Sequence, residues 1–121
     1  MQGEIFAAAE VLIPSPDATF PSTLVYASNR NIGPNDDPRG DAITIFTLDA
    51  DGKLRIINQF FTGLKQVLEM QFGGPDNRFL VASGIVGNGG VVVFERAGQG
   101  AKSVQVASNK DIPSLASFVW V

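Results

Sequence analysis

The feature that most constrains this chain is an apolar run that ends in a polar tip and recurs later in the sequence. Residues 24–27 are apolar, residues 28–30 form the polar tip Ser-Asn-Arg, and a polar segment at 31–41 separates them from a second apolar run at 42–46. Residues 79–83 repeat the first run, a glycine-rich segment at 84–90 takes the place of the polar one, and residues 91–94 repeat the second run. The chain is therefore expected to contain two copies of one structural unit.

The spacing of the copies and their composition favour β-strands. The offset between them is about 48 to 55 residues, near the period of β-propeller blades. Short apolar runs separated by 13 glycines and seven prolines are typical of strands and turns, not of long helices. Both faces of the runs at 42–46 and 90–94 are apolar, so each needs cover on both sides, and stacked blades supply it.

We therefore predict an all-β fold of two consecutive four-stranded antiparallel propeller blades, at about 7–61 and about 66–108, within a single partial propeller domain over 1–121. The predicted strands lie near 8–13, 23–28, 42–46, 54–60, 67–72, 78–83, 89–95 and 103–107, with turns at 49–52 and 74–77. The apolar segment at 112–121 is predicted to be a closing strand. Because two blades cannot close a ring, their outer faces are expected to be apolar and exposed, which favours aggregation or assembly.

Composition excludes several classes of function. Nine basic and twelve acidic residues give a formal charge of -3 with no basic patch, so nucleic acid is not an expected partner. The chain has no cysteine and no histidine, which removes thiolate chemistry, the Ser-His-Asp triad and the commonest transition-metal ligand. No run approaches the roughly 20 apolar residues of a membrane span, and no basic region typical of a signal peptide opens the chain. A cytoplasmic location without membrane contact is expected.

Five segments, taken in order, resemble the lactonase-type seven-bladed β-propellers and, among these, the fungal carboxy-cis,cis-muconate cyclases. They are residues 26–30, 40–46, 62–64 with 70–74, 92–96 and 117–120. The resemblance covers nearly the whole chain but corresponds only to the carboxy-terminal blades of such a protein. It implies the last part of a seven-bladed propeller.

The resemblance also implies where a site would lie. Members of the family are metal-free and need no cofactor, and their active site lies at one mouth of the central channel. The segments at 31–40, 62–66 and 84–89 would share that face. Arg30 matches a family arginine, so it is the expected catalytic residue, and Arg30, Asn29 and Lys65 are the expected substrate-binding residues. The expected ligand is a small anion, either a polycarboxylate or a sugar lactone.

The implied function is that of a fragment of a cyclase-like lactonising enzyme, an isomerase that adds a carboxylate across a double bond in the same molecule. An arginine can hold one carboxylate bidentately and stabilise the developing enolate. A 6-phosphogluconolactonase-like hydrolase, in which a base activates water, is one alternative. A non-catalytic β-repeat module that acts only by assembly, through missing blades or self-association, is the other.

Several residues weigh against activity or have simpler explanations. The family's histidine and glutamate candidates belong to blades that this chain does not contain, and Leu68 and Glu69 stand where relatives often carry an arginine-glycine pair, so the fragment alone is expected to be inactive. Arg30 could equally form an ion pair with a nearby aspartate, at position 36, 37 or 41. Residues 49–52 resemble the start of a calcium loop, but Phe60 stands where its final glutamate belongs, so a turn is predicted.

Overall fold

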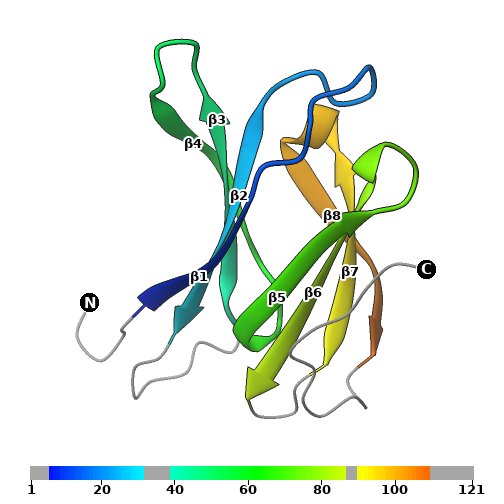
Figure 1. Ribbon diagram of the computed structural model, residues 1–121. Coiled ribbons are helices and arrows are strands. Elements are labelled where there is room, and N and C mark those ends of the chain that lie inside the picture. The colour runs from blue at the N-terminus through cyan, green and yellow to red at the C-terminus, as the bar shows by residue number, and fades with distance from the viewer. Residues whose placement is uncertain (1–5, 32–38, 87–89, 110–121) are drawn as a thin grey trace.

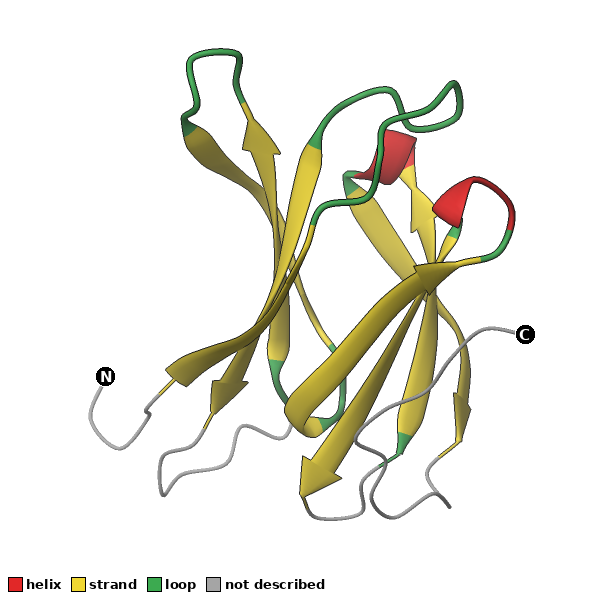
Figure 2. Ribbon diagram, viewed as in Figure 1, coloured by secondary structure: helices red, strands yellow, loops and turns green. Residues whose placement is uncertain are grey.

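The computed structural model describes residues 6–31, 39–86 and 90–109, and within them the chain is all-β. Eight strands form two four-stranded antiparallel sheets (Figure 1). Two short 3-10 turns, η1 (Pro75–Asn77) and η2 (Gly98–Gly100), are the helical elements of the described residues (Figure 2). The predicted closing strand at 112–121 lies outside the described residues.

Each sheet is a meander in which every strand pairs with its neighbour along the chain. Sheet 1 contains β1 (Phe6–Leu12), β2 (Leu24–Asn31), β3 (Ala42–Leu48) and β4 (Leu54–Phe61). Sheet 2 contains β5 (Lys65–Gly73), β6 (Phe79–Val86), β7 (Val91–Ala97) and β8 (Lys102–Asn109). The prediction of two four-stranded antiparallel units is confirmed.

The turns between strands use the residues that the sequence indicated. The β3–β4 turn closes through hydrogen bonds from Asp49 N–H to the Lys53 carbonyl and from Gly52 N–H to the Asp49 carbonyl, both 2.9 Å. Between β5 and β6, Gly74 and Asn77 adopt positive φ angles of 76° and 49°, which glycine and asparagine tolerate best. The predicted turns at both places are confirmed.

Several strands are longer than predicted, and two of them continue into segments predicted to be loops. β2 continues to Asn31 because Phe6 of β1 pairs with it. β6 continues to Val86, in the segment predicted to be a glycine-rich loop, because Lys65 at the start of β5 pairs with it. A loop beginning at Gly84 was thus the wrong prediction, since β5 supplies pairing partners as far as Val86.

The two sheets pack face to face, as Figure 1 shows, with β5 against β1 and β2. Their shared core is made of residues from both sheets: Leu24, Tyr26, Ile43 and Ile45 from sheet 1, Val67, Met70, Leu80, Ala82, Val92 and Phe94 from sheet 2, and Leu64 between them. Aromatic rings meet edge to face across the interface, with centroids 4.8 Å apart for Tyr26 and Phe72 and 4.9 Å apart for Phe60 and Phe94. This geometry adds to the stabilisation from buried area.

The first strands of the two sheets, β1 and β5, carry equivalent bulges. In β1 the register shifts between Ala8 and Val11, and Val11 then pairs with Ala27. In β5 it shifts between residues 67 and 69, and Met70 then pairs with Ala82. Val11 and Met70 are therefore equivalent positions, and this agrees with the sequence repeat, which matches Ala27 to Ala82.

The equivalent positions show that the sheets stack head to tail. Ala82 and Phe94 lie in the interface with sheet 1. Their counterparts in sheet 1, Ala27 and Phe46, alternate with the core residues Tyr26 and Ile45 and so lie on the face turned away from sheet 2. Each sheet thus uses a different face, as consecutive members of a stack do.

No helix among the residues that the structure describes is long and apolar enough to cross a membrane.

Candidate functional site

The three predicted site residues lie at one end of the two sheets. Asn29, near the end of β2, pairs with Ala8 on one side and Ala42 on the other. Arg30 follows it and pairs with Ala7 through the backbone. Lys65 is the first residue of β5 and pairs with Val86. Of the loops predicted to share this end, residues 32–38 and 87–89 lie outside the described residues.

A buried aspartate joins these strands, and we call the group around it the Asp41 clasp. The backbone of Asp41 donates to the Leu64 carbonyl at 2.7 Å and accepts from Thr62 N–H at 2.9 Å. Its carboxylate accepts from Val67 N–H at 2.8 Å, and its residue is only 2% exposed. Because Asp41 precedes Ala42, the partner of Asn29, and Leu64 precedes Lys65, the clasp holds Asn29 and Lys65 at the same end.

The clasp depends on a close approach of two backbones. Gly40 has a φ of 83°, and a Cβ placed on it would lie 2.6 Å from both the nitrogen and the oxygen of Leu64. On the neighbouring residue, the guanidinium of Arg39 lies 3.9 Å from the centre of the Phe61 ring, a cation–π contact. The roles of Gly40 and Asp41 in the clasp were not predicted, although both residues fall in a segment that carried the resemblance.

Two glutamates occupy the equivalent bulges of β1 and β5. Glu10 donates its backbone N–H to Ser28 Oγ at 3.0 Å. Glu69 pairs with Ser83, the counterpart of Ser28, and its carboxylate accepts from Gln71 Nε2 at 3.3 Å. Burial, and to a lesser extent the charge of Glu69, raise the pKa of Glu10 above its ordinary value of 4.5.

Glu10 is the glutamate of this pair whose environment favours acid–base chemistry. A carboxyl group whose pKa is raised keeps its proton to higher pH and can exchange it with a bound ligand. The pairing was missed because the two glutamates are far apart in sequence and become equivalent only through the bulges. A signal existed, since each glutamate immediately precedes the equivalent residues Val11 and Met70.

Replacing Glu10 by glutamine is expected to remove a pH-dependent loss of stability. Since the folded-state pKa of Glu10 is raised, the protein gains stability when Glu10 is protonated and loses it as the pH rises from about the ordinary value of 4.5 through the folded-state pKa. The Glu10→Gln variant should therefore be more stable than the wild type at pH 7 and no more stable at pH 4, by midpoints of urea unfolding.

Two further variants make this measurement specific. Glu69→Gln should reduce part of the same pH dependence by removing the neighbouring charge. Glu95→Gln, which removes a half-buried carboxylate from β7, serves as the control and should leave the difference between pH 4 and pH 7 unchanged. Identical pH profiles for Glu10→Gln and the wild type would contradict the assigned environment.

A buried arginine lies at the opposite end of the interface, where Arg96 of β7 is only 5% exposed. Its guanidinium carbon lies 4.0 Å from the centre of the Phe20 ring and 5.1 Å from that of Phe72. Its Nε donates to the Tyr26 hydroxyl at 3.1 Å, and that hydroxyl donates to the Gly100 carbonyl at 2.6 Å. The contacts come from both sheets, so Arg96 and Tyr26 fasten the interface.

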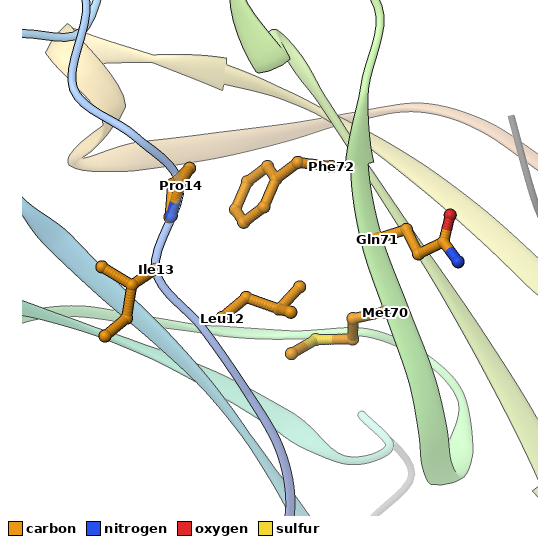
Figure 3. A pocket seen from close by; sticks show the side chains of 6 residues that line it. All are labelled: Leu12, Ile13, Pro14, Met70, Gln71 and Phe72. Carbon is orange, nitrogen blue, oxygen red and sulfur yellow. The ribbon is translucent and has the colours of Figure 1, made fainter.

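An apolar groove lies between the end of β1 and β5 (Figure 3). Its volume is about 270 Å³, and it is lined by Leu12, Ile13, Pro14, Met70, Gln71 and Phe72. Leu12, Met70 and Phe72 point toward one another, whereas the amide of Gln71 points away, as Figure 3 shows. With no charged lining residue, the groove does not suit an anionic substrate.

Within the described part of the chain, no group of three His, Cys, Asp or Glu side chains could hold a metal ion. Comparison of the chain with family models, with curated proteins and with solved structures found no significant match. The relation to the lactonase-type propellers, the activity and the role of Arg30 therefore stay predictions.

Proposed function

We propose that the two sheets are consecutive blades of a lactonase-type propeller and that this chain supplies part of the mouth of a lactonising enzyme. The observation that carries the proposal is the head-to-tail stacking of two equivalent meanders whose inner strands, β1 and β5, lie side by side. Head-to-tail stacks of four-stranded meanders are how propellers are built. The ends of the inner strands would then border a central channel.

The proposed ligand is a small polycarboxylate of the muconate type. Arg30 and Lys65 would bind its carboxylates, Arg30 bidentately and Lys65 as a point charge. Asn29 would donate its side-chain amide to the same ligand. The support for this grouping is the Asp41 clasp, which ties the start of β3, where Ala42 pairs with Asn29, to the start of β5.

In the proposed reaction, one carboxylate oxygen of the ligand attacks a carbon of a double bond and forms the new C–O bond of a lactone. The electron pair of the double bond moves to the adjacent carbon and is delocalised onto a second carboxylate, where Arg30 would stabilise it. Glu10, whose raised pKa favours its protonated form, would give its proton to that carbon. The lactone gains the proton that Glu10 loses, Glu10 then takes up a proton from solvent, and no oxidant or reductant is needed.

The test is a titration of 3-carboxy-cis,cis-muconate into the chain, followed by calorimetry. Loss of one charge-assisted contact removes roughly 1.5 to 3 kcal/mol, so Arg30→Ala and Lys65→Ala should each weaken binding by about tenfold or more. Arg55→Ala and Lys53→Ala are matched controls, because both cations are exposed at the opposite end of sheet 1. They should bind like the wild type.

If the matched controls lose as much affinity for the muconate as Arg30→Ala and Lys65→Ala, only overall charge matters. If the chain does not bind the muconate, the non-catalytic module is favoured. Loss of diene absorbance that depends on Arg30 and Glu10 would establish the cyclisation. Turnover of a sugar lactone in place of the muconate would favour the hydrolase. Binding without turnover is the result expected if the missing blades carry the remaining catalytic groups.

A further inference from the structure

Large apolar side chains are exposed together on the face of sheet 1 that is turned away from sheet 2, which we call the outer face of sheet 1. Val11 pairs with Ala27 and is 57% exposed, and Ile56 pairs with Phe46 and is 65% exposed. Because paired residues project from the same face of a sheet, both lie on this outer face. Leu48 and Leu54, which also pair, add to it.

The same positions are buried in sheet 2. Met70, the counterpart of Val11, is 1% exposed, and Phe94, the counterpart of Phe46, is 3% exposed. Both are buried because sheet 1 covers them. In sheet 2, the equivalent face is apolar and packs against sheet 1. The outer face of sheet 1 has the same apolar character.

The outer face of sheet 2 carries apolar residues at the complementary positions, of which Val81 is 9% exposed and Phe79, Val91 and Val93 are half-buried. Its residues Phe79, Val81, Val91 and Val93 hold the positions that Leu24, Tyr26, Ile43 and Ile45 hold in sheet 1. In sheet 1 those four residues lie in the core, on the face that packs against sheet 2. Val104, which pairs with Glu95 at the margin of this face, is 55% exposed. The surface is apolar at the same four positions.

We propose that the outer face of sheet 1 docks on the outer face of sheet 2 of a second copy of this chain. The contact would continue the head-to-tail stacking that is already present inside one chain. Sheet 2 of one copy would pack against sheet 1 of the next copy. Such an interface uses two different surfaces, so it either closes into a ring or extends with each added copy. No substrate contact is involved, so this proposal and the proposed binding at Arg30 can fail independently.

The test uses sedimentation velocity on chains that carry a charge on one face only. The wild type should form species larger than a dimer as its concentration rises. Val11→Glu with Ile56→Glu should block the outer face of sheet 1, and Val104→Glu should weaken the outer face of sheet 2, each giving monomers when alone. Gln105→Glu is the matched control, because it is exposed on β8 but pairs with Phe94 on the opposite face.

Mixing the two blocked variants decides the geometry of the interface. Each variant keeps one intact face, so the mixture should form dimers and nothing larger. Circular dichroism should first show that all variants keep the β-sheet spectrum of the wild type. A monomeric wild type, or assembly that survives both substitutions, would overturn the proposal.

Two other results would also overturn it. Dimers of the Val104→Glu variant alone, together with monomers of the Val11→Glu and Ile56→Glu variant, would show that the outer face of sheet 1 pairs with itself. Cosedimentation of the wild type with neutral phosphatidylcholine vesicles, abolished by Val11→Glu with Ile56→Glu, would assign this face to lipid.

Discussion

Replacing Gly40 by alanine is expected to lower the free energy of unfolding by about 3 kcal/mol. The positive φ of 83° disfavours any side chain there, and the added methyl group would meet the backbone of Leu64 at 2.6 Å. Because that contact is with backbone and not with a flexible side chain, relief requires the Asp41 clasp to open. Urea unfolding monitored by circular dichroism measures the effect.

Gly52 provides a matched control for this substitution. It has the same φ of 83°, but a Cβ there meets nothing within 4 Å. Gly52→Ala should therefore cost only the backbone strain, about 1 kcal/mol. Equal costs at the two positions would show that the approach of residue 40 to Leu64 contributes nothing.

Replacing Tyr26 by phenylalanine is expected to cost about 2 to 3 kcal/mol, because one hydroxyl serves two buried partners. The hydroxyl donates to the Gly100 carbonyl and accepts from Arg96 Nε. Its removal leaves a buried carbonyl and a buried charged donor without these bonds, and unsatisfied buried groups are costly. The free energy of unfolding from urea titration at pH 7 measures the loss.

Thr47→Val is the control for deleting a hydroxyl, since Thr47 Oγ1 donates to the Arg55 carbonyl at an exposed position. It should change stability by less than about 0.5 kcal/mol. Similar losses for Tyr26→Phe and Thr47→Val would contradict the fastening role of Tyr26.

Alkaline pH adds an independent readout for Tyr26. Burial raises the pKa of Tyr26 above its ordinary value of 10.0, and the nearby Arg96 offsets part of that rise. Because the folded-state pKa is raised, the stabilisation is present below pH 10 and is lost as the pH rises through the folded-state value. Tyr26→Phe should lack this loss.

Strand positions and turns were predictable because they depend on local features. Apolar runs of about four to eight residues, bounded by glycine, proline and asparagine, are sufficient to indicate strands. The turns at 49–52 and 74–77 followed from residue type alone. The end of β6 was not predictable, because Gly84 and the residues after it are held in a strand by β5, some twenty residues earlier.

The candidate site was predictable only in part. The grouping of Asn29, Arg30 and Lys65 at one end followed from the order of strands in a meander. The roles of Asp41 and Arg96 did not, because each depends on contacts between sheets. Asp41 was considered only as an ion-pair partner of Arg30, and its hydrogen bond from Val67 N–H was not predicted.

The sequence by itself determined an all-β chain with one repeated four-stranded unit, since strand-forming runs and turns recur in the same order. Only the tertiary structure decided which face of each strand is buried. Both faces of the central runs are apolar, so alternation of residue types cannot choose between them. The bulges in β1 and β5 set the register, and head-to-tail stacking then covers Met70 and leaves its counterpart Val11 exposed.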